Sequence, residues 1–242
     1  MSLQSLRIRN FKAVVDSKSV KLGPLTAFIG NNGAGKSSLI EALETYQAIV
    51  RDGLDAAMQR WLGIEHVRHK AQEAKERMGR LVNPISFELA LGESPRKVRR
   101  LAMTVNNDPA ANRMLIVNER MTRQDGTWTE RDSVGALQSY GAGRSMLPFS
   151  LDETQVRVAD EVLAWQFLTL SPERMGLPVP QQRTKGAVRL ASDGSNVADF
   201  LLDLRRQSPS AFNGIVETMA YVLPYAKDIQ PTLTSSEIDR KA

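Results

Sequence analysis

Residues 30–37 read Gly30-Asn31-Asn32-Gly33-Ala34-Gly35-Lys36-Ser37, and the apolar run Leu25-Thr26-Ala27-Phe28-Ile29 stands directly before them. The helix-forming segment Ser38-Leu39-Ile40-Glu41-Ala42-Leu43-Glu44 follows. Gly-x-x-x-x-Gly-Lys-Ser between a strand and a helix is the pattern of a phosphate-binding loop. The sequence therefore predicts a strand over 25–29, a loop, and a helix from Lys36 to about Val50.

The chemistry of this loop follows from its residue types. Glycines allow successive backbone N–H groups to turn inward around phosphates, and the positive end of the next helix faces the same point. We expect Lys36 to reach the β- and γ-phosphates and the Ser37 hydroxyl to hold Mg²⁺. A plain glycine-rich turn is the alternative, and it is disfavoured because spacing, Lys, Ser and context agree. The predicted nucleotide-binding residues are Gly30, Asn31, Asn32, Gly33, Ala34, Gly35, Lys36, Ser37 and Ser38.

Composition narrows the classes of protein. The 242 residues include no cysteine, which excludes disulfides and thiolate zinc sites, and only two histidines, His66 and His69. We interpret the histidines as surface or partner-contacting residues, because two leave little scope for a metal site. The sequence has no signal-peptide core and no apolar run near the roughly 18 residues of a membrane span. These features predict a cytoplasmic protein that does not insert into membranes.

Charge is unevenly placed along the chain. Residues 1–100 carry 17 Lys and Arg against 10 Asp and Glu, whereas residues 101–242 carry 15 against 17. A basic half could face nucleic acid, and an ordinary solvated surface explains the modest excess equally well. The densest cluster is Arg96, Lys97, Arg99 and Arg100. Strand alternation puts Lys97 and Arg99 on one face and Arg96 and Arg100 mostly on the other, which favours a solvated edge strand with at most weak DNA binding.

The rest of the chain divides into three segments. Residues 1–50 hold two short strands, 3–9 and 18–22 with a turn near Val15–Ser17, then the phosphate loop and first helix. Residues 51–150 begin helical and charged, and from 84 to 131 alternate as antiparallel strands around the turn Gln124-Asp125-Gly126. Residues 151–242 fit helices over 152–168, 196–207 and 209–222.

Three motifs together resemble a known family. They are the loop itself, the opening Leu6-Arg7-Ile8-Arg9-Asn10-Phe11-Lys12, and the later block Leu190-Ala191-Ser192-Asp193-Gly194-Ser195-Asn196-Val197-Ala198. They resemble the N-terminal part of the ABC-type, AAA-family ATPase heads of the SMC, RecF and OLD group. Local explanations compete for the last two: Asn10-Phe11-Lys12 could be a strand end, a core aromatic and a surface lysine, and Asp193–Asn196 could be a turn with an N-cap.

The resemblance carries several expectations. It implies an α/β phosphate-loop fold of the ABC-head type, with a β-rich N-terminal subdomain and an antiparallel β insertion followed by helices. It implies ATP and Mg²⁺ as ligands, with Lys12 near the nucleotide. It further implies a homodimer or a partner ATPase head that sandwiches the ATP, possible contact with nucleic acid, and a role in repair or anti-phage defence.

Two parts of such a head are missing from the sequence. There is no apolar strand ending in Asp-Glu and no signature loop, since Leu170-Ser171-Pro172-Glu173 lacks the glycine. Asn118-Glu119 follows an apolar run but has Asn where that Asp-Glu motif requires Asp. Asp160-Glu161 has both acidic residues but no apolar strand before them. No glutamine among Gln47, Gln59 and Gln72 stands out as the one that couples Mg²⁺ to water, and the catalytic residue stays open. We therefore expect the N-terminal part of a longer ATPase, weak or inactive in hydrolysis by itself.

Two alternatives remain. A nucleotide-gated interaction module would bind ATP and change shape without turnover. A small kinase or GTPase is less compatible with the sequence, because it lacks an Asn-Lys-x-Asp guanine motif and its loop follows a β-rich opening.

Overall fold

The computed structural model describes the greater part of the chain, which folds into two compact units, Met1–Trp165 and Gln166–Ala242. The described residues are 1–70, 83–94, 97–108, 113–122, 126–132, 141–149, 153–177, 188–225 and 228–231. The three segments predicted from the sequence, 1–50, 51–150 and 151–242, remain a prediction.

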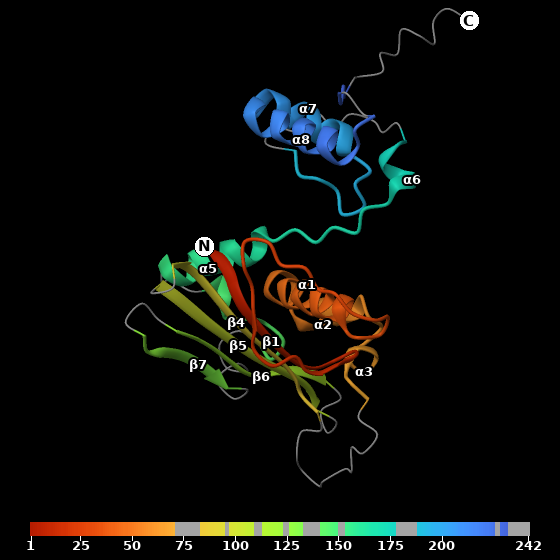
Figure 1. The fold of residues 1–242 in the computed structure, drawn as a ribbon. Coiled ribbons are helices and arrows are strands. Elements are labelled where there is room, and N and C mark those ends of the chain that lie inside the picture. The colour runs from red at the N-terminus through yellow and green to blue at the C-terminus, as the bar shows by residue number, and fades with distance from the viewer. Residues whose placement is uncertain are drawn as a thin grey trace, which may run out of the picture. The chain divides into compact units, whose positions relative to one another are not determined.

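A seven-stranded antiparallel sheet forms the frame of the first unit (Figure 1). Its order is β2-β1-β4-β5-β6-β7, and β3 also pairs with β1. The strands are β1 (Ser2–Phe11), β2 (Val14–Asp16), β3 (Val20–Lys21), β4 (Ile85–Ser94), β5 (Lys97–Asp108), β6 (Arg113–Thr122) and β7 (Trp128–Asp132). The antiparallel strands expected between 84 and 131 are therefore present, although Gln124 and Asp125 of the expected hairpin turn lie outside the described residues.

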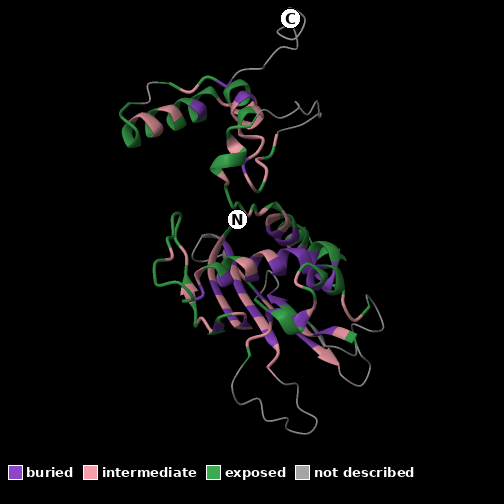
Figure 2. Ribbon diagram, turned by 90° about the vertical axis from the view of Figure 1, so that its right-hand side faces the viewer, coloured by how far each residue is buried: buried purple, intermediate pink, exposed green. Residues whose placement is uncertain are grey.

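One face of this sheet is the core of the unit. Alternation along the strands turns Leu6 and Ile8 of β1, and Phe87 and Leu89 of β4, to the same side, where each is at most 2% exposed. Figure 2 shows buried residues along the strands and on the helices that cover them. The opposite face carries the alternate, polar positions.

The covering helix is α1 (Lys36–Asp52), the helix predicted to follow the phosphate loop. Tyr46 on this helix is 1% exposed, and the centroid of its ring lies 5.6 Å from that of the Phe87 ring. The helix ends at Gly53, whose N–H donates to Ile49 O. A side chain at Gly53 would meet the carbonyl oxygen of Gly143 at 3.3 Å. The chain continues from this glycine into α2 (Leu54–Gln59) and then α3 (Ile64–Val67).

The helix α5 (Glu153–Ala164) packs beside α1, as does the short 3-10 turn η1 (Leu147–Phe149). The buried amide of Gln47 on α1 donates to the carbonyl oxygens of Val162 at 2.8 Å and Trp165 at 2.9 Å. These carbonyls stand at the C-terminus of α5, where the helix itself supplies no partner. Gln47 therefore ties the middle of α1 to the end of α5.

Three sequence expectations fail in the first unit. The turn predicted near Val15–Ser17 lies earlier, because Asn10 and Lys12 have left-handed backbones (φ 56° and 47°) and residues 14–16 form β2. The basic segment is no edge strand, since β6 pairs beyond β5.

The third failure is the strand predicted over 25–29. Those residues have no regular structure, and Leu25 and Ile29 are 93% and 94% exposed. A strand requires a neighbour that supplies hydrogen bonds. Both sides of β1 are already occupied, by β2 and β3 on one side and β4 on the other, and no described residue supplies a parallel strand to pair with 25–29.

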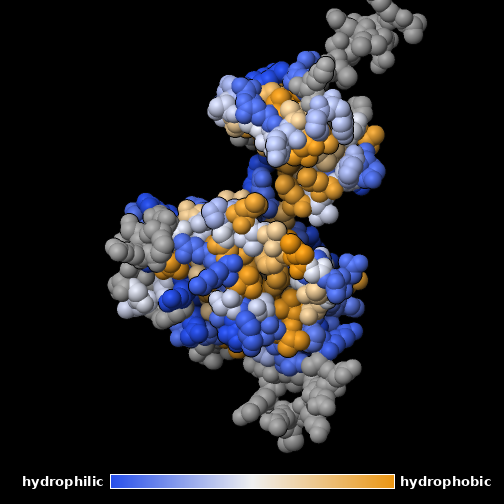
Figure 3. Space-filling model, viewed as in Figure 1, coloured by the Kyte–Doolittle hydropathy of each residue, from blue (hydrophilic) through white to orange (hydrophobic). Residues whose placement is uncertain are grey.

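The second unit is built from α6 (Pro172–Met175), α7 (Val197–Gln207) and α8 (Pro209–Val222), the last two close to the predicted bounds. Gly194 has a φ of +76°, and a side chain there would lie 2.8 Å from Met175 Cγ. Asn196 accepts from Ala191 N–H at 2.7 Å and donates to Arg189 O at 2.9 Å. This block thus holds the start of α7. Figure 3 shows hydrophobic surface exposed on this unit.

Candidate nucleotide-binding site

The phosphate loop wraps the beginning of α1. Gly33 and Gly35 both have left-handed backbones, with φ of 84° and 86°, which L-residues with a side chain adopt at a cost. A side chain on Gly35 would also meet Val14 Cγ2 at 3.2 Å, whereas one on Gly33 would meet nothing within 4 Å. Glycine is therefore favoured at position 35 for two reasons: the loop turns there with a left-handed backbone, and the β1–β2 turn packs so close that a side chain would have to displace it.

The N-terminus of α1 is open. Gly35 is its N-cap, so no side chain caps the helix, and the first turn holds no acidic residue. The first N–H groups of a helix have no partner within it and carry the positive end of the helix dipole. The Ser37 side chain is exposed beside them, while Ser38 is 8% exposed and turned into the protein. An anion at this point would meet donors and no negative charge from the first turn.

Lys36 spans the loop. Its ammonium donates to the carbonyl oxygens of Gly30 at 2.7 Å and Asn31 at 2.8 Å. An ammonium has three donors, so these two bonds hold the charge over the loop with one donor left. Lys36 therefore ties the end of the loop back to its first two residues, while the binding of a nucleotide by residues 30–38 stays a prediction.

Lys12 lies beside the second turn of α1. Its ammonium donates to Glu41 Oε2 at 2.8 Å and stands 3.6 Å from the ring centroid of Trp61. Its backbone N–H donates to Val67 O at 2.6 Å, and its carbonyl bonds with the His69 ring nitrogen Nδ1 at 2.7 Å. The predicted contact of Lys12 with the nucleotide stays a prediction. The neighbouring residue Ala13 approaches the loop, with its Cβ 3.8 Å from the position of a side chain on Gly35.

The carboxylates weighed from the sequence have partners outside the loop. Glu119 on β6 is 2% exposed and accepts from Ser145 Oγ and, at 2.7 Å, from Met146 N–H. Burial raises the pKa of the Tyr46 hydroxyl, and the charge of Glu119 raises it further. Glu161 on α5 forms an ion pair with the N-terminal amine of Met1 at 3.6 Å. Both carboxylates have a structural role at these positions.

The three glutamines considered from the sequence as partners of Mg²⁺ lie in three different places. Gln47 is buried on the α5 carbonyls, Gln59 is exposed on α2, and Gln72 lies outside the described residues.

The contact of the β1–β2 turn with Gly35 was missed by sequence reasoning, because nothing local to Ala13-Val14 indicates which residue far along the chain they touch.

The residues present fit a nucleotide with Mg²⁺. The described part of the chain contains no group of three His, Cys, Asp or Glu that could hold a metal by itself. Mg²⁺ is commonly held by one or two protein groups together with phosphate oxygens, and the exposed Ser37 hydroxyl is the group that would hold it here. No helix within the described ranges has the length and apolar character needed to cross a membrane.

Comparison with known proteins gives one family match. Residues 1–50 match the model of a family described as AAA ATPase domain, a stretch that includes β1, the phosphate loop and most of α1. The match supports an AAA-type ATPase that binds ATP, and the mixed α/β architecture with its antiparallel sheet is compatible with such a domain. No curated protein matches the chain.

Proposed function

We propose that this chain is the ATP-binding N-terminal part of an SMC-, RecF- or OLD-like ATPase head. The observation that carries the proposal is the phosphate loop itself, with two left-handed glycines leading into an uncapped helix and Lys36 held across the loop. The family match over residues 1–50 supports the ATPase part. The finer subtype rests on the resemblance of the opening strand and of the block around Gly194.

Each loop residue has a role in this proposal. The backbone N–H groups of 33–38 and the dipole of α1 bind the phosphates. Lys36 keeps one donor for the β- and γ-phosphates, and Ser37 holds Mg²⁺, which supplies charge neutralisation when bound. Hydrolysis belongs to the complete head, with a second head closing over the ATP. Nucleic-acid repair or anti-phage defence is the proposed setting.

Lys36→Ala tests the proposal. It should weaken binding of a fluorescent Mg·ATP analogue at least tenfold, about 1.4 kcal/mol, because one of the principal phosphate donors is lost. Lys21→Ala is the matched control, since this exposed lysine on β3 is outside the loop. Competition with GTP measures the preference for adenine. Equal affinities for the two variants, both folded by circular dichroism, would remove the loop from the proposal.

A second function, a nucleotide-gated interaction module without turnover, is favoured by one observation. Glu119 and Glu161, the two glutamates weighed as catalytic, are engaged by Ser145 and by the Met1 amine. We therefore expect the chain to bind Mg·ATP and to show no steady-state hydrolysis above that of Lys36→Ala. Multiple turnover lost in Lys36→Ala would instead show that this chain contains its own catalytic carboxylate.

A further inference from the structure

The turn that joins β1 to β2 contacts the phosphate loop while it holds an unfavourable backbone. Asn10 and Lys12 have left-handed backbones, with φ of 56° and 47°, a conformation that residues with a side chain adopt at a cost. Two residues after Lys12, Val14 Cγ2 stands 3.2 Å from the position that a side chain on Gly35 would take. Gly35 is the N-cap of α1, so this turn packs directly against the start of that helix.

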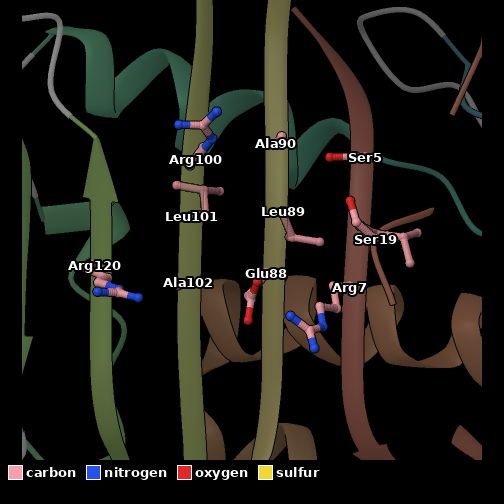
Figure 4. Close-up of a pocket in the computed structure, with 11 residues that line it drawn as sticks. Ser5, Arg7, Ser19, Glu88, Leu89, Ala90, Arg100, Leu101, Ala102 and Arg120 are labelled. Carbon is pink, nitrogen blue, oxygen red and sulfur yellow. The ribbon is translucent and has the colours of Figure 1, made fainter. Parts of the chain in front are cut away.

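An ion pair joins the two strands of this hairpin. Arg7, on the outer face of β1 (Figure 4), donates to both carboxylate oxygens of Asp16 on β2, at 2.9 and 2.8 Å. These bonds are the main reason why the pKa of the Asp16 carboxyl lies well below its usual range. The pair fixes the strands themselves, and the strained residues of the turn need a different support.

The segment that follows α3 supplies this support through its backbone. The N–H of Lys12 donates to Val67 O at 2.6 Å, and the N–H of His69 donates to Asn10 O at 2.9 Å. These bonds surround an isolated antiparallel bridge between the end of β1 and the residue after α3. Both left-handed residues of the turn are therefore bonded to the same segment.

That segment is itself anchored to the sheet. The guanidinium group of Arg68 donates to the side-chain oxygen of Asn106 at 2.6 Å and to that of Asn107 at 2.5 Å, both on β5. Asn106 is 1% exposed, so one of these acceptors lies in the interior. A chain of contacts therefore leads from β5 through residues 67–69 and the β1–β2 turn to Gly35.

The imidazole ring of His69 completes the support. Its Nδ1 lies 2.7 Å from Lys12 O, and because a carbonyl oxygen can only accept, Nδ1 carries the hydrogen. The peptide groups on both sides of Lys12 are thus held, one through its N–H and the other through its carbonyl. The bond from the ring is made by a side chain, so a substitution can remove it and leave the backbone bonds in place.

We propose that His69 is a positioning residue for the phosphate loop and acts through the β1–β2 turn. The ring holds the carbonyl of Lys12, the turn keeps its left-handed conformation, and Val14 stays packed against Gly35. Without the ring, the turn relaxes toward a more favourable backbone and the start of α1 loses this contact. The consequence for nucleotide affinity rests on the proposed ATP site, whereas the consequence for the loop itself does not.

The first experiment needs no nucleotide and uses the full chain. The N–H of Leu39 donates to Gly35 O at 3.1 Å, so its hydrogen exchange, followed by NMR, reports how often the start of α1 opens. His69→Leu should speed this exchange about threefold or more and leave the amides of β5 unchanged. His69→Asn should restore the wild-type rate, because its amide N–H can donate to the same carbonyl. His66→Leu is the matched control, since His66 is exposed on α3.

A second variant tests whether His69 acts through the turn. Val14→Ala removes the contact with Gly35 and leaves the ring in place, and it should speed exchange at Leu39 as His69→Leu does. The double variant should exchange no faster than either single variant, because both changes interrupt one path. Additive effects, or equal acceleration at Leu39 and in β5, would overturn the proposal, because the ring would then contribute only general stability.

Binding of Mg·ATP to the same variants gives the link to function. The affinity should fall about threefold or more in His69→Leu and stay at the wild-type value in His69→Asn and His66→Leu. Unchanged affinity together with unchanged exchange in His69→Leu overturns the positioning role and leaves the ATP site standing. A wild-type chain that does not bind Mg·ATP contradicts the proposed function instead, and the exchange rates alone then test the role of His69.

Discussion

At the scale of single residues, Gly33 and Gly35 have nearly the same φ and different surroundings. Both need a left-handed φ, yet only Gly35 has a side chain of the β1–β2 turn against it. The pair therefore separates two costs that usually occur together, the strain of the backbone and the clash of a new Cβ.

Gly35→Ala should destabilise the chain more than Gly33→Ala. Left-handed strain costs each variant about 1–2 kcal/mol, and the alanine at 35 must in addition displace Val14. Urea unfolding of both variants measures the difference, and the Mg·ATP affinity should fall more for Gly35→Ala because the start of α1 shifts. Equal unfolding free energies would mean that the β1–β2 turn yields to the new methyl group without cost.

At the scale of elements, the second unit holds the start of α7 against α6 through one carboxylate. Asp193 accepts from the backbone N–H of Ser195 at 3.0 Å and from Arg174 at 2.9 Å. The bonds from Ser195, followed by that from Arg174, lower the pKa of Asp193 from 3.8 to about 2. The folded state therefore stabilises the ionised form of the Asp193 carboxyl group.

The sign of the pH dependence follows from this. A depressed pKa in the folded state contributes stability above the unfolded value near 3.8, and this contribution is lost as pH falls toward about 2. Thermal unfolding from pH 5 to 2 should show a wild-type advantage over Asp193→Asn that shrinks across that interval. The comparison between variants cancels the other carboxylates of the chain. An advantage that stays constant with pH would remove Asp193 as its source.

At the scale of the whole molecule, the segment before the phosphate loop stands outside the sheet. Leu25→Ala and Ile29→Ala should each change the unfolding free energy by no more than about 0.5 kcal/mol, because nearly all of each side chain is already in water. Ile49→Ala on α1, which is fully buried, is the control and should cost about 2–5 kcal/mol. A loss of unfolding free energy of that size in Leu25→Ala or Ile29→Ala would mean that these side chains are packed against the protein.

The difference between what local patterns predict and what they miss is physical. The helix after the loop and the strands of 84–131 follow from features within a few residues, such as Lys36-Ser37 before an apolar face and alternation along Ile85–Leu91. Whether 25–29 becomes a strand depends on a partner strand. Which residues of β1, β4, β5 and β6 stand opposite one another depends on pairings between segments far apart in the sequence, and only the face of Arg100 could be inferred from its own neighbours.

The amide of Gln47 has two hydrogens, and three carbonyls lie within its reach: Val162 at 2.8 Å, Leu163 at 3.3 Å and Trp165 at 2.9 Å. More acceptors than donors make the arrangement degenerate. Whichever two of the three carbonyls accept, the end of α5 keeps both side-chain donors, so a single amide on α1 holds the last turn of the first unit in place.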